Sequence, residues 1–134
     1  MKITDKMLKS VWLQDTSVYM VNQTAPGHEV YKSNDYLDTA KAIKTGIVKD
    51  AKAISSAGAC GTAQAALQFE GGDFEEFKEY VLNAAKLLKS AKQNSNELKN
   101  AVDFVLDKMF SGNSITNSKM RAFEAASYFI FQNS

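Results

Sequence analysis

The hydrophobic and polar positions divide this chain into a short N-terminal part with strand-like patterns and a longer part with helical spacing. Residues 11–14 and 17–21 are rich in β-branched and aromatic side chains, and the Asp15–Thr16 pair between them favours a turn. Residues 28–32 alternate polar and apolar side chains, which predicts a half-buried third strand. We therefore predict a three-stranded antiparallel sheet within residues 1–33, covered by a helix because so small a sheet is not stable alone.

From residue 34 to residue 134 the apolar side chains recur at helical spacing, which predicts a mainly α fold with a bundle of about five helices. Capping residues precede three of these helices: Asn34 or Asp35, Asp73 with Glu76 three residues later, and Asn94 with Glu97 three residues later. The last helix is expected from about Ser118 onward. The positions expected to face the core are Leu37, Ala40 and Ile43, then Phe74, Phe77, Val81, Leu82, Ala85 and Leu88, then Leu98, Ala101, Val102, Val105, Leu106 and Met109, and finally Met120, Phe123, Ala126 and Ile130.

The stretch from Ala42 to Gly61 is unusual because it is dominated by alanine, serine and glycine in its second half. A glycine costs a helix about 0.5–1 kcal/mol relative to alanine, so helix stability alone does not explain this composition. Small side chains let a helix backbone come close to its neighbours. We interpret the stretch as the start of a central helix that continues to about Phe69 and packs tightly on several others. A backbone approached by a ligand is the alternative.

The composition of the 134 residues limits the classes of function. Hydrophobic residues make up 45%, enough for the core of one domain, and 16 basic against 15 acidic residues give a net charge of +1. Without a field of one sign, neither nucleic acid nor a membrane is an expected partner. One cysteine and one histidine argue against a metal site, and no cofactor is expected. A chain that cannot form an internal disulfide fits a reducing compartment, so we expect a cytoplasmic protein.

The sequence contains no catalytic triad, phosphate loop or nucleophile motif. Cys60 lies among alanines and glycines, where a buried thiol behaves as a small hydrophobe, and His28 is expected on the surface of the third strand. Lys49, Lys52 and Lys92 flank expected helix starts. Lysines beside the unpaired N–H groups of a helix start can hold a phosphate, whereas simple solvation of these side chains is the alternative.

The end of the chain carries more apolar side chains than one helix face can bury. Tyr128, Phe129, Ile130 and Phe131 are consecutive, and a helix that is apolar all round is covered on more than one side. The sheet or a second polypeptide is expected to cover them, so Tyr128, Phe129 and Phe131 are candidate contacts with a partner. One or two exposed aromatic rings without a partner are the simpler alternative.

Several segments resemble one known family. VWLQ and SVYMVNQT are similar to its Trp-containing first strand and to its second strand, which ends in an Asp-Gln-Thr-like turn, here Asn22-Gln23-Thr24. AIKTGIVKDAKAIS, followed directly by SAGACG, lines up without a gap with an Ala-Ile helix and an Arg-Gly-Ala-Pro-Ala-Ile-Gly motif. SAKQNSNELKNAVDFVL takes the place of a Ser-Thr-Arg-Pro-Thr motif and the helix after it. RAFEAASYFIFQNS looks like the last helix before a second domain.

The family that these segments resemble is that of the methylthioribose-1-phosphate isomerases, over nearly the whole chain. It shares its fold with ribose-1,5-bisphosphate isomerase and with the regulatory subunits of translation initiation factor 2B. The resemblance implies an N-terminal helical domain that precedes a larger Rossmann-like domain. That larger domain carries the cysteine and aspartate that convert an aldose phosphate to a ketose phosphate. This chain stops where the second domain would begin, so no catalytic residue is assigned, and Cys60 is not the family's catalytic cysteine.

In the family, the helical domain contributes mainly arginines that bind phosphate. Matched position by position, these arginines fall on Lys49 and Lys92, the glycine of the first motif on Asp50, and the two prolines on Lys52 and Gln93. The lysines keep the positive charge but lose the bidentate guanidinium fork. Asp50 places a carboxylate near the expected phosphate. The resemblance thus implies Lys49, Lys52 and Lys92 as contacts of a substrate phosphate.

Three functions fit these observations. The first is the N-terminal domain or split subunit of a sugar-phosphate aldose–ketose isomerase of methionine salvage, assembled with a separate Rossmann-like catalytic chain. The second is a non-catalytic regulatory or binding module of the initiation factor 2B branch, with a sugar phosphate or nucleotide as ligand. The third is a helical protein that forms a homodimer. Catalysis by this chain alone is not expected, because aldose–ketose isomerisation needs a positioned acid–base pair.

Overall fold

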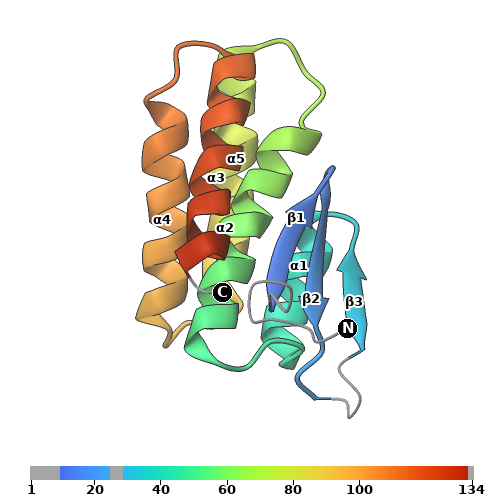
Figure 1. Cartoon of the computed structure of the whole chain (residues 1–134). Helices are drawn as coiled ribbons and strands as arrows, with labels where there is room; N and C mark the ends of the chain where they lie inside the picture. Colours follow the sequence, from blue (N-terminus) through green and yellow to red (C-terminus); the bar gives the residue numbers. More distant parts are fainter. Residues whose placement is uncertain (1–9, 25–28, 133–134) are drawn as a thin grey trace.

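The computed structural model describes residues 10–24 and 29–132, and its N-terminal part is a small sheet (Figure 1). Three antiparallel strands lie side by side in chain order: β1 (Val11–Gln14), β2 (Ser17–Val21) and β3 (Val30–Ser33). Asp15 makes the turn between the first two with a φ of 58°, a left-handed conformation that aspartate tolerates. The first two strands have the predicted bounds. The third is observed from Val30, and His28 lies outside the described residues.

One face of the sheet packs on the helices and the other faces outward. Val11 pairs with Met20 across β1 and β2, and both side chains are buried together with Val18. Trp12 and Tyr19 point to the opposite face, where their rings stack with centroids 5.4 Å apart. This alternation of buried and outward side chains is what an antiparallel sheet with one covered face requires.

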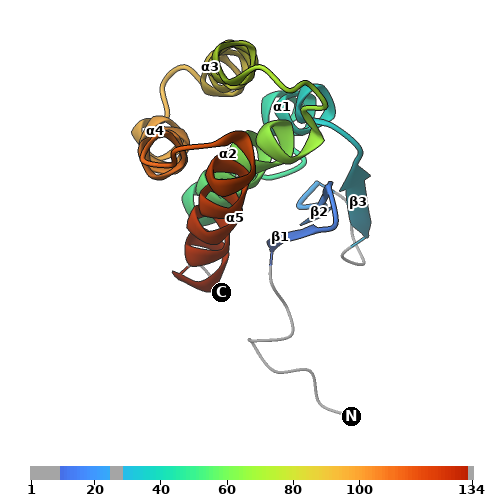
Figure 2. The ribbon, with the colours of Figure 1, turned by 90° about the horizontal axis from the view of Figure 1, so that it is seen from above.

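Five helices follow the sheet: α1 (Tyr36–Thr45), α2 (Ala51–Gln68), α3 (Phe74–Ser90), α4 (Asn96–Phe110) and α5 (Ile115–Gln132). Each helix from α2 to α5 runs opposite to the one before it, as Figure 1 shows. Figure 2 shows α2 in the middle, with the other helices and the sheet around it. The predicted fold class, a mainly α bundle of five helices with a three-stranded antiparallel N-terminal sheet, is confirmed.

The small residues of α2 allow it to occupy the centre of the bundle. Its residues from Ala53 to Ala66 are all buried. A Cβ added to Gly58 would lie 2.4 Å from Cδ1 of Leu98 on α4, and one added to Gly61 would lie 2.9 Å from Cδ2 of Leu88 on α3. Both distances are shorter than real carbon–carbon contacts, so glycine at these positions is what lets α3 and α4 come close.

A buried glutamine on α2 joins the sheet to the helices. Gln64 is fully buried, and its Nε2 donates to the main-chain oxygens of Thr16 and Ser33, each at 3.1 Å. Its Oε1 accepts a hydrogen bond from Oγ1 of Thr39 on α1 at 2.7 Å. One side chain therefore satisfies groups at the β1–β2 turn, at the end of β3 and on α1, as buried polar atoms require.

Four apolar side chains that we expected in the core are exposed instead: Leu37 (54%), Leu82 (47%), Met120 (57%) and Phe123 (43%). The reason is clearest on α5, whose buried residues are mostly small: Ser118, Ala122, Ala125, Ala126 and Ile130. Because α5 lies directly against α2, only small side chains fit between the two backbones, and the larger ones point away.

Two predicted helix starts also differ from the structure. The cap of α4 is Ser95 rather than Asn94, because Oγ of Ser95 accepts a hydrogen bond from the N–H of Leu98 at 3.1 Å. The last helix begins at Ile115, before the predicted Ser118. The cap of α1 is Asp35, one of the two residues predicted for this role, and its carboxylate accepts from the N–H of Asp38 at 2.8 Å.

Candidate functional site

The turn after β2 is fastened to the start of α2 by Gln23. Its main-chain N–H donates to the oxygen of Ile47 at 2.8 Å. Its side-chain oxygen accepts from the N–H groups of Lys49 and Asp50, and its amide nitrogen donates to the Asp50 carboxylate at 2.5 Å. The Asn22-Gln23-Thr24 turn and the segment before α2, which resemble two separate motifs in the sequence, are thus in direct contact.

Asp50 occupies the N-terminus of α2, where an anionic ligand would otherwise bind. Its Oδ1 accepts a hydrogen bond from the N–H of Ala53 at 2.8 Å, so it is the N-cap of the helix. A helix N-terminus attracts anions through its unpaired N–H groups and its dipole. Here the protein's own carboxylate takes that position, which leaves less room and a less favourable field for a phosphate.

The three candidate lysines belong to one end of the bundle, which we call the lower end: the segment 46–50, the first turn of α2 that follows it, and the segment 91–95 (Figure 1). Lys49 and Lys52 are exposed on either side of the α2 N-terminus, and Lys92 is exposed in the loop between α3 and α4. The fold brings two segments more than 40 residues apart to the same end of the bundle.

The aromatic side chains near the end of α5 do not share one environment. The ring of Phe129 is half-buried, with its centroid 5.2 Å from that of Phe104 on α4. Tyr128 stacks on the same Phe104 ring at 5.4 Å and is 51% exposed, whereas Phe131 is 76% exposed. Tyr128 and Phe131 are therefore exposed, and Phe129 mainly packs within the bundle.

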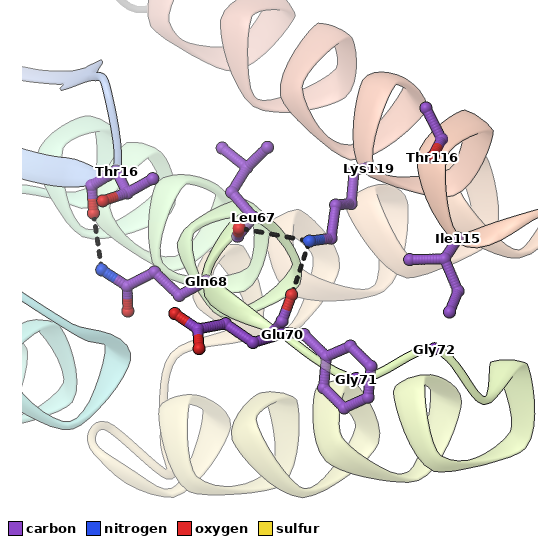
Figure 3. Close-up of a pocket in the computed structure, with 10 residues that line it drawn as sticks. Thr16, Leu67, Gln68, Glu70, Gly71, Gly72, Ile115, Thr116 and Lys119 are labelled. Carbon is purple, nitrogen blue, oxygen red and sulfur yellow. Dashed lines mark hydrogen bonds between the residues drawn. The ribbon is translucent and has the colours of Figure 1, made fainter.

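An open pocket lies at the opposite end of the bundle, beside the last turn of α2 (Figure 3). It has a volume of about 900 Å³ and is wide open. Nζ of Lys119 donates to the main-chain oxygens of Phe69 (2.6 Å) and Leu67 (3.4 Å), and Nε2 of Gln68 donates to that of Thr16 (2.9 Å). Sequence patterns did not reveal Lys119, because it caps a helix 50 residues away in the chain. These groups satisfy the protein's own carbonyls and do not converge on a ligand.

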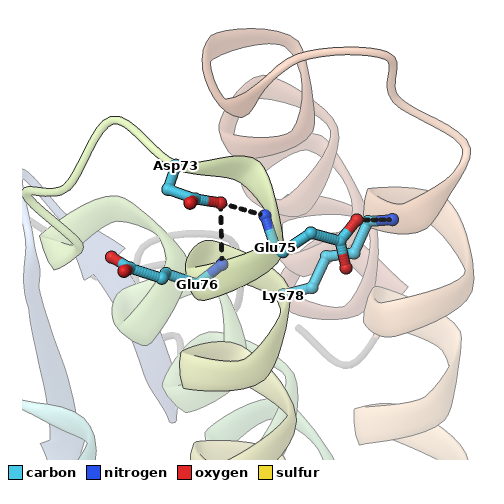
Figure 4. Close-up of polar contacts among 4 residues, drawn as sticks. All are labelled: Asp73, Glu75, Glu76 and Lys78. Carbon is cyan, nitrogen blue, oxygen red and sulfur yellow. Dashed lines mark hydrogen bonds and ion pairs between the residues drawn. The ribbon is translucent and has the colours of Figure 1, made fainter.

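The acidic residues that follow α2 serve the start of α3. Asp73 accepts hydrogen bonds from the N–H groups of Glu75 (2.8 Å) and Glu76 (3.3 Å), as Figure 4 shows. Glu75 forms an ion pair with Lys78 at 3.4 Å. The predicted cap at Asp73 is confirmed.

Within residues 10–24 and 29–132, no cluster of histidine, cysteine, aspartate and glutamate side chains is suited to a metal ion. No helix in this part of the chain is long and apolar enough to cross a membrane.

Cys60 sits in the middle of α2 with no exposed surface. Burial raises the pKa of its thiol from 9.0 to about 12, because a thiolate would lose its hydration there. The nucleophilic form of cysteine is the thiolate, so this residue is not available for catalysis.

We expect Cys60 to react with a soluble thiol reagent only when the chain unfolds. At pH 8 its modification should be at least roughly a hundredfold slower than in denaturant, because access requires opening of the core. A Ser90→Cys variant, with an exposed thiol at the end of α3, provides the rapid reference. Equal rates at the two positions in native protein would contradict the burial of Cys60.

The structure thus defines a helical domain with a small sheet fastened to its central helix. No protein-family model matches the chain. In sequence it is similar to an Archaeoglobus fulgidus protein assigned provisionally as a methylthioribose-1-phosphate isomerase, with 31% identity over 114 residues. It is also 32% identical over 106 residues to the methylthioribose-1-phosphate isomerase of Desulforudis audaxviator. These alignments cover 84% and 78% of this chain but 34% and 29% of the relatives, so the chain spans about a third of their length.

Two solved structures share the fold. The delta subunit of translation initiation factor eIF-2B from A. fulgidus superposes with a TM-score of 0.85 and 30% identity, over 91% of this chain and 36% of that one. The 5-methylthioribose 1-phosphate isomerase of Pyrococcus horikoshii OT3 gives 0.84 and 27%, over 90% of this chain and 35% of that one. The resemblance seen in the sequence is confirmed: over most of its length the chain is similar to methylthioribose-1-phosphate isomerases and to the delta subunit of eIF-2B.

Proposed function

We propose that this chain is a non-catalytic helical module of a sugar-phosphate isomerase-like assembly, in which a separate chain supplies the Rossmann-like domain. In this assembly the lower end of the bundle faces the phosphorylated ligand. The observation that carries the proposal is the arrangement of that end, where the Gln23 turn contacts the start of α2 and the α3–α4 loop lies at the same end of the bundle. The similarity to methylthioribose-1-phosphate isomerases over one part of their length supports the same assignment.

The module would contribute positive charge and a fixed backbone for phosphate binding, and no catalytic acid–base groups. Lys49, Lys52 and Lys92 offer ammonium groups to a phosphate, while the Gln23 contacts hold the backbone of Lys49 and Asp50 in place. An ammonium is a compact charge that contacts one phosphate oxygen at a time, so we expect weaker and less directional binding than arginines give. The acid–base groups of an isomerisation would come from the separate chain.

The first test measures binding of a ribose phosphate to the isolated chain and to a Lys49→Ala, Lys92→Ala double variant. We expect the double variant to bind roughly tenfold more weakly, since two exposed charge contacts are lost. Lys86→Ala removes an exposed lysine from the middle of α3 and should leave the affinity unchanged. Equal affinity of the double variant and the parent chain would remove these lysines from the proposed site.

A regulatory or binding module of the initiation factor 2B branch is the second candidate, and the position of Asp50 favours it. A carboxylate that caps α2 opposes phosphate binding at the same point. In this case the chain would assemble with its partner without binding a sugar phosphate. The similarity to the delta subunit of eIF-2B from A. fulgidus is consistent with such a role.

Asp50→Gly discriminates between the two candidates. This change frees the N–H of Ala53 and removes a negative charge, and because the bond from Gln23 is lost together with the cap we expect it to cost about 1 kcal/mol of stability. We expect the affinity for inorganic phosphate to rise by about tenfold if the lower end is a phosphate site that Asp50 weakens. Asp73→Gly opens the N-terminus of α3 in the same way, at the other end of the bundle. An equal gain in both variants would show a general property of helix ends and would favour the regulatory candidate.

The proposed partner is tested by purification of the tagged chain from its native host, followed by mass spectrometry. We expect a co-purifying chain with a Rossmann-like isomerase domain, and aldose–ketose isomerisation of a sugar phosphate by the complex. Recovery of the chain alone, or only as a self-associated species, would contradict the split assembly.

A further inference from the structure

A groove of about 500 Å³ lies along the α4–α5 pair and includes none of the three lysines of the lower end. Pockets for small ligands have volumes of about 300–1,000 Å³. The groove is lined by Phe104, Lys108, Arg121, Glu124, Ala125 and Tyr128. We propose that it binds a nucleoside monophosphate, a ligand in which an aromatic base and a phosphate are joined by a sugar. This site goes beyond the function proposed above, because it uses none of the same residues.

The aromatic end of the groove offers a stacking surface. The rings of Tyr128 and Phe104 lie 5.4 Å apart at 27°, and Phe129 supports Phe104 edge-on at 5.2 Å. Because Tyr128 is 51% exposed while one side of its ring is held by Phe104, it presents a rigid apolar face to a ligand. Stacking of a nucleobase on such a face does not depend on which base is present.

The other end of the groove is cationic. Nε of Arg121 donates to Oδ1 of Asn117 at 3.1 Å, and its Nη1 donates to Oγ of Ser111 at 3.0 Å. These two bonds fix the guanidinium and leave its other donors for a phosphate. Nζ of Lys108 lies 5.6 Å from the ring centroid of Phe104 and lines the same groove. Among the described residues the ion pairs involve other side chains, so neither cation of the groove is paired directly with a carboxylate, and Glu124 is the acidic side chain that lines the groove beside them.

The order of these groups along the groove matches the order of the parts of the ligand. Tyr128 and Arg121 are seven residues apart on α5, which separates their backbones by roughly 10 Å along the helix axis. Glu124 lies between them, and Ala125 is small enough to leave space beside it. A base stacked on Tyr128 would place its sugar hydroxyls near the Glu124 carboxylate, which accepts hydrogen bonds, and its phosphate near Arg121 and Lys108.

The experiment compares adenosine monophosphate, adenosine and inorganic phosphate as probes, by calorimetric or NMR titration of the whole chain. We expect adenosine monophosphate to bind at least about tenfold more tightly than either part alone, because both ends of the groove are then occupied. Arg121→Ala should weaken the monophosphate by about tenfold and leave adenosine unaffected, and Tyr128→Leu should weaken both by a similar factor. Circular dichroism confirms that each variant is folded.

Two controls separate this groove from other positive surface. Lys78→Ala removes an ammonium that lies 4.7 Å from the ring of Phe74 on α3, a similar cation–ring pair without an arginine, and should change nothing. The titrations are repeated in the Lys49→Ala, Lys92→Ala double variant, where the lower end has lost two of its phosphate contacts, and the effects of Arg121→Ala and Tyr128→Leu should persist there. Binding no tighter than that of phosphate alone, no loss in Arg121→Ala, or complete loss in the lower-end double variant would overturn the proposal.

Discussion

Replacing Gly58 with valine is expected to lower the free energy of unfolding by about 3 kcal/mol, at the upper end of what overpacking of a core costs. The first added carbon alone would lie 2.4 Å from Cδ1 of Leu98 and 3.3 Å from Cγ2 of Val102, and both of these side chains are fully buried. Valine adds two further methyl groups. α4 would have to move away from α2, or Leu98 would have to leave its rotamer. Denaturant unfolding monitored by circular dichroism measures the loss.

Two further variants show whether the loss comes from the packing of α2 on α4. Ala51→Val introduces the same β-branched side chain at the exposed start of α2, and should cost no more than about 0.7 kcal/mol. Leu98→Ala makes space, so combined with Gly58→Val it should destabilise the fold by less than the sum of the two single changes. Additive losses in the free energy of unfolding would mean that the two positions are not energetically coupled.

Replacing Gln64 with leucine is expected to cost about 3 kcal/mol, since buried polar groups that lose their partners cost about 1–3 kcal/mol each. Leucine has a similar size but accepts and donates no hydrogen bonds. The main-chain oxygens of Ser33 and Thr16 would each lose a bond of 3.1 Å, although that of Thr16 would keep its bond from Gln68. Oγ1 of Thr39 would lose its acceptor at 2.7 Å and keep the oxygen of Asp35 at 3.2 Å. Thermal or denaturant unfolding reports the change.

Gln68 provides a matched control one helical turn later. Its Nε2 also donates to two main-chain oxygens, those of Thr16 (2.9 Å) and Asn34 (2.7 Å), but it is only partly buried. Water can replace these bonds, so Gln68→Leu should cost about 1 kcal/mol or less. Similar losses for the two glutamines would show that the burial of Gln64 contributes nothing of its own.

Most of the fold could be predicted from the sequence because its local signals agree with one another. The first two strands alternate as their positions in the sheet require, and Asp73 caps α3 as predicted. The predictions were wrong where the packing between helices determines which side chains are buried. The periodicity of α5 favoured burial of Met120 and Phe123, but the close contact with α2 selects the small side chains of the opposite stripe. A single sequence does not show how closely two of its helices approach.

The candidate sites also combine residues that the sequence indicates with contacts that only the folded structure shows. The resemblance pointed to Lys49, Lys52 and Lys92, and the fold brings the segments that carry them to one end of the bundle. The contacts of Gln23 with the start of α2 and of Lys119 with its end join residues 26 to 52 positions apart, so no local pattern predicts them. Asp50 could be identified from the sequence as a carboxylate near the expected phosphate, but its role as a cap is seen only in the structure.

The hydrogen bonds of Gln64 also determine the order in which the sheet and the helices can fold during synthesis on the ribosome. The strands lie within the first 33 residues of the chain and leave the exit tunnel early, yet their buried face and two of their carbonyls are completed by α2, up to 48 residues later. Contacts of large sequence separation form late. The buried face of the sheet therefore stays uncovered until residue 64 and its helix have emerged from the ribosome. During that interval β1, with its apolar side chains and open edge, is the part of the nascent chain most in need of a chaperone.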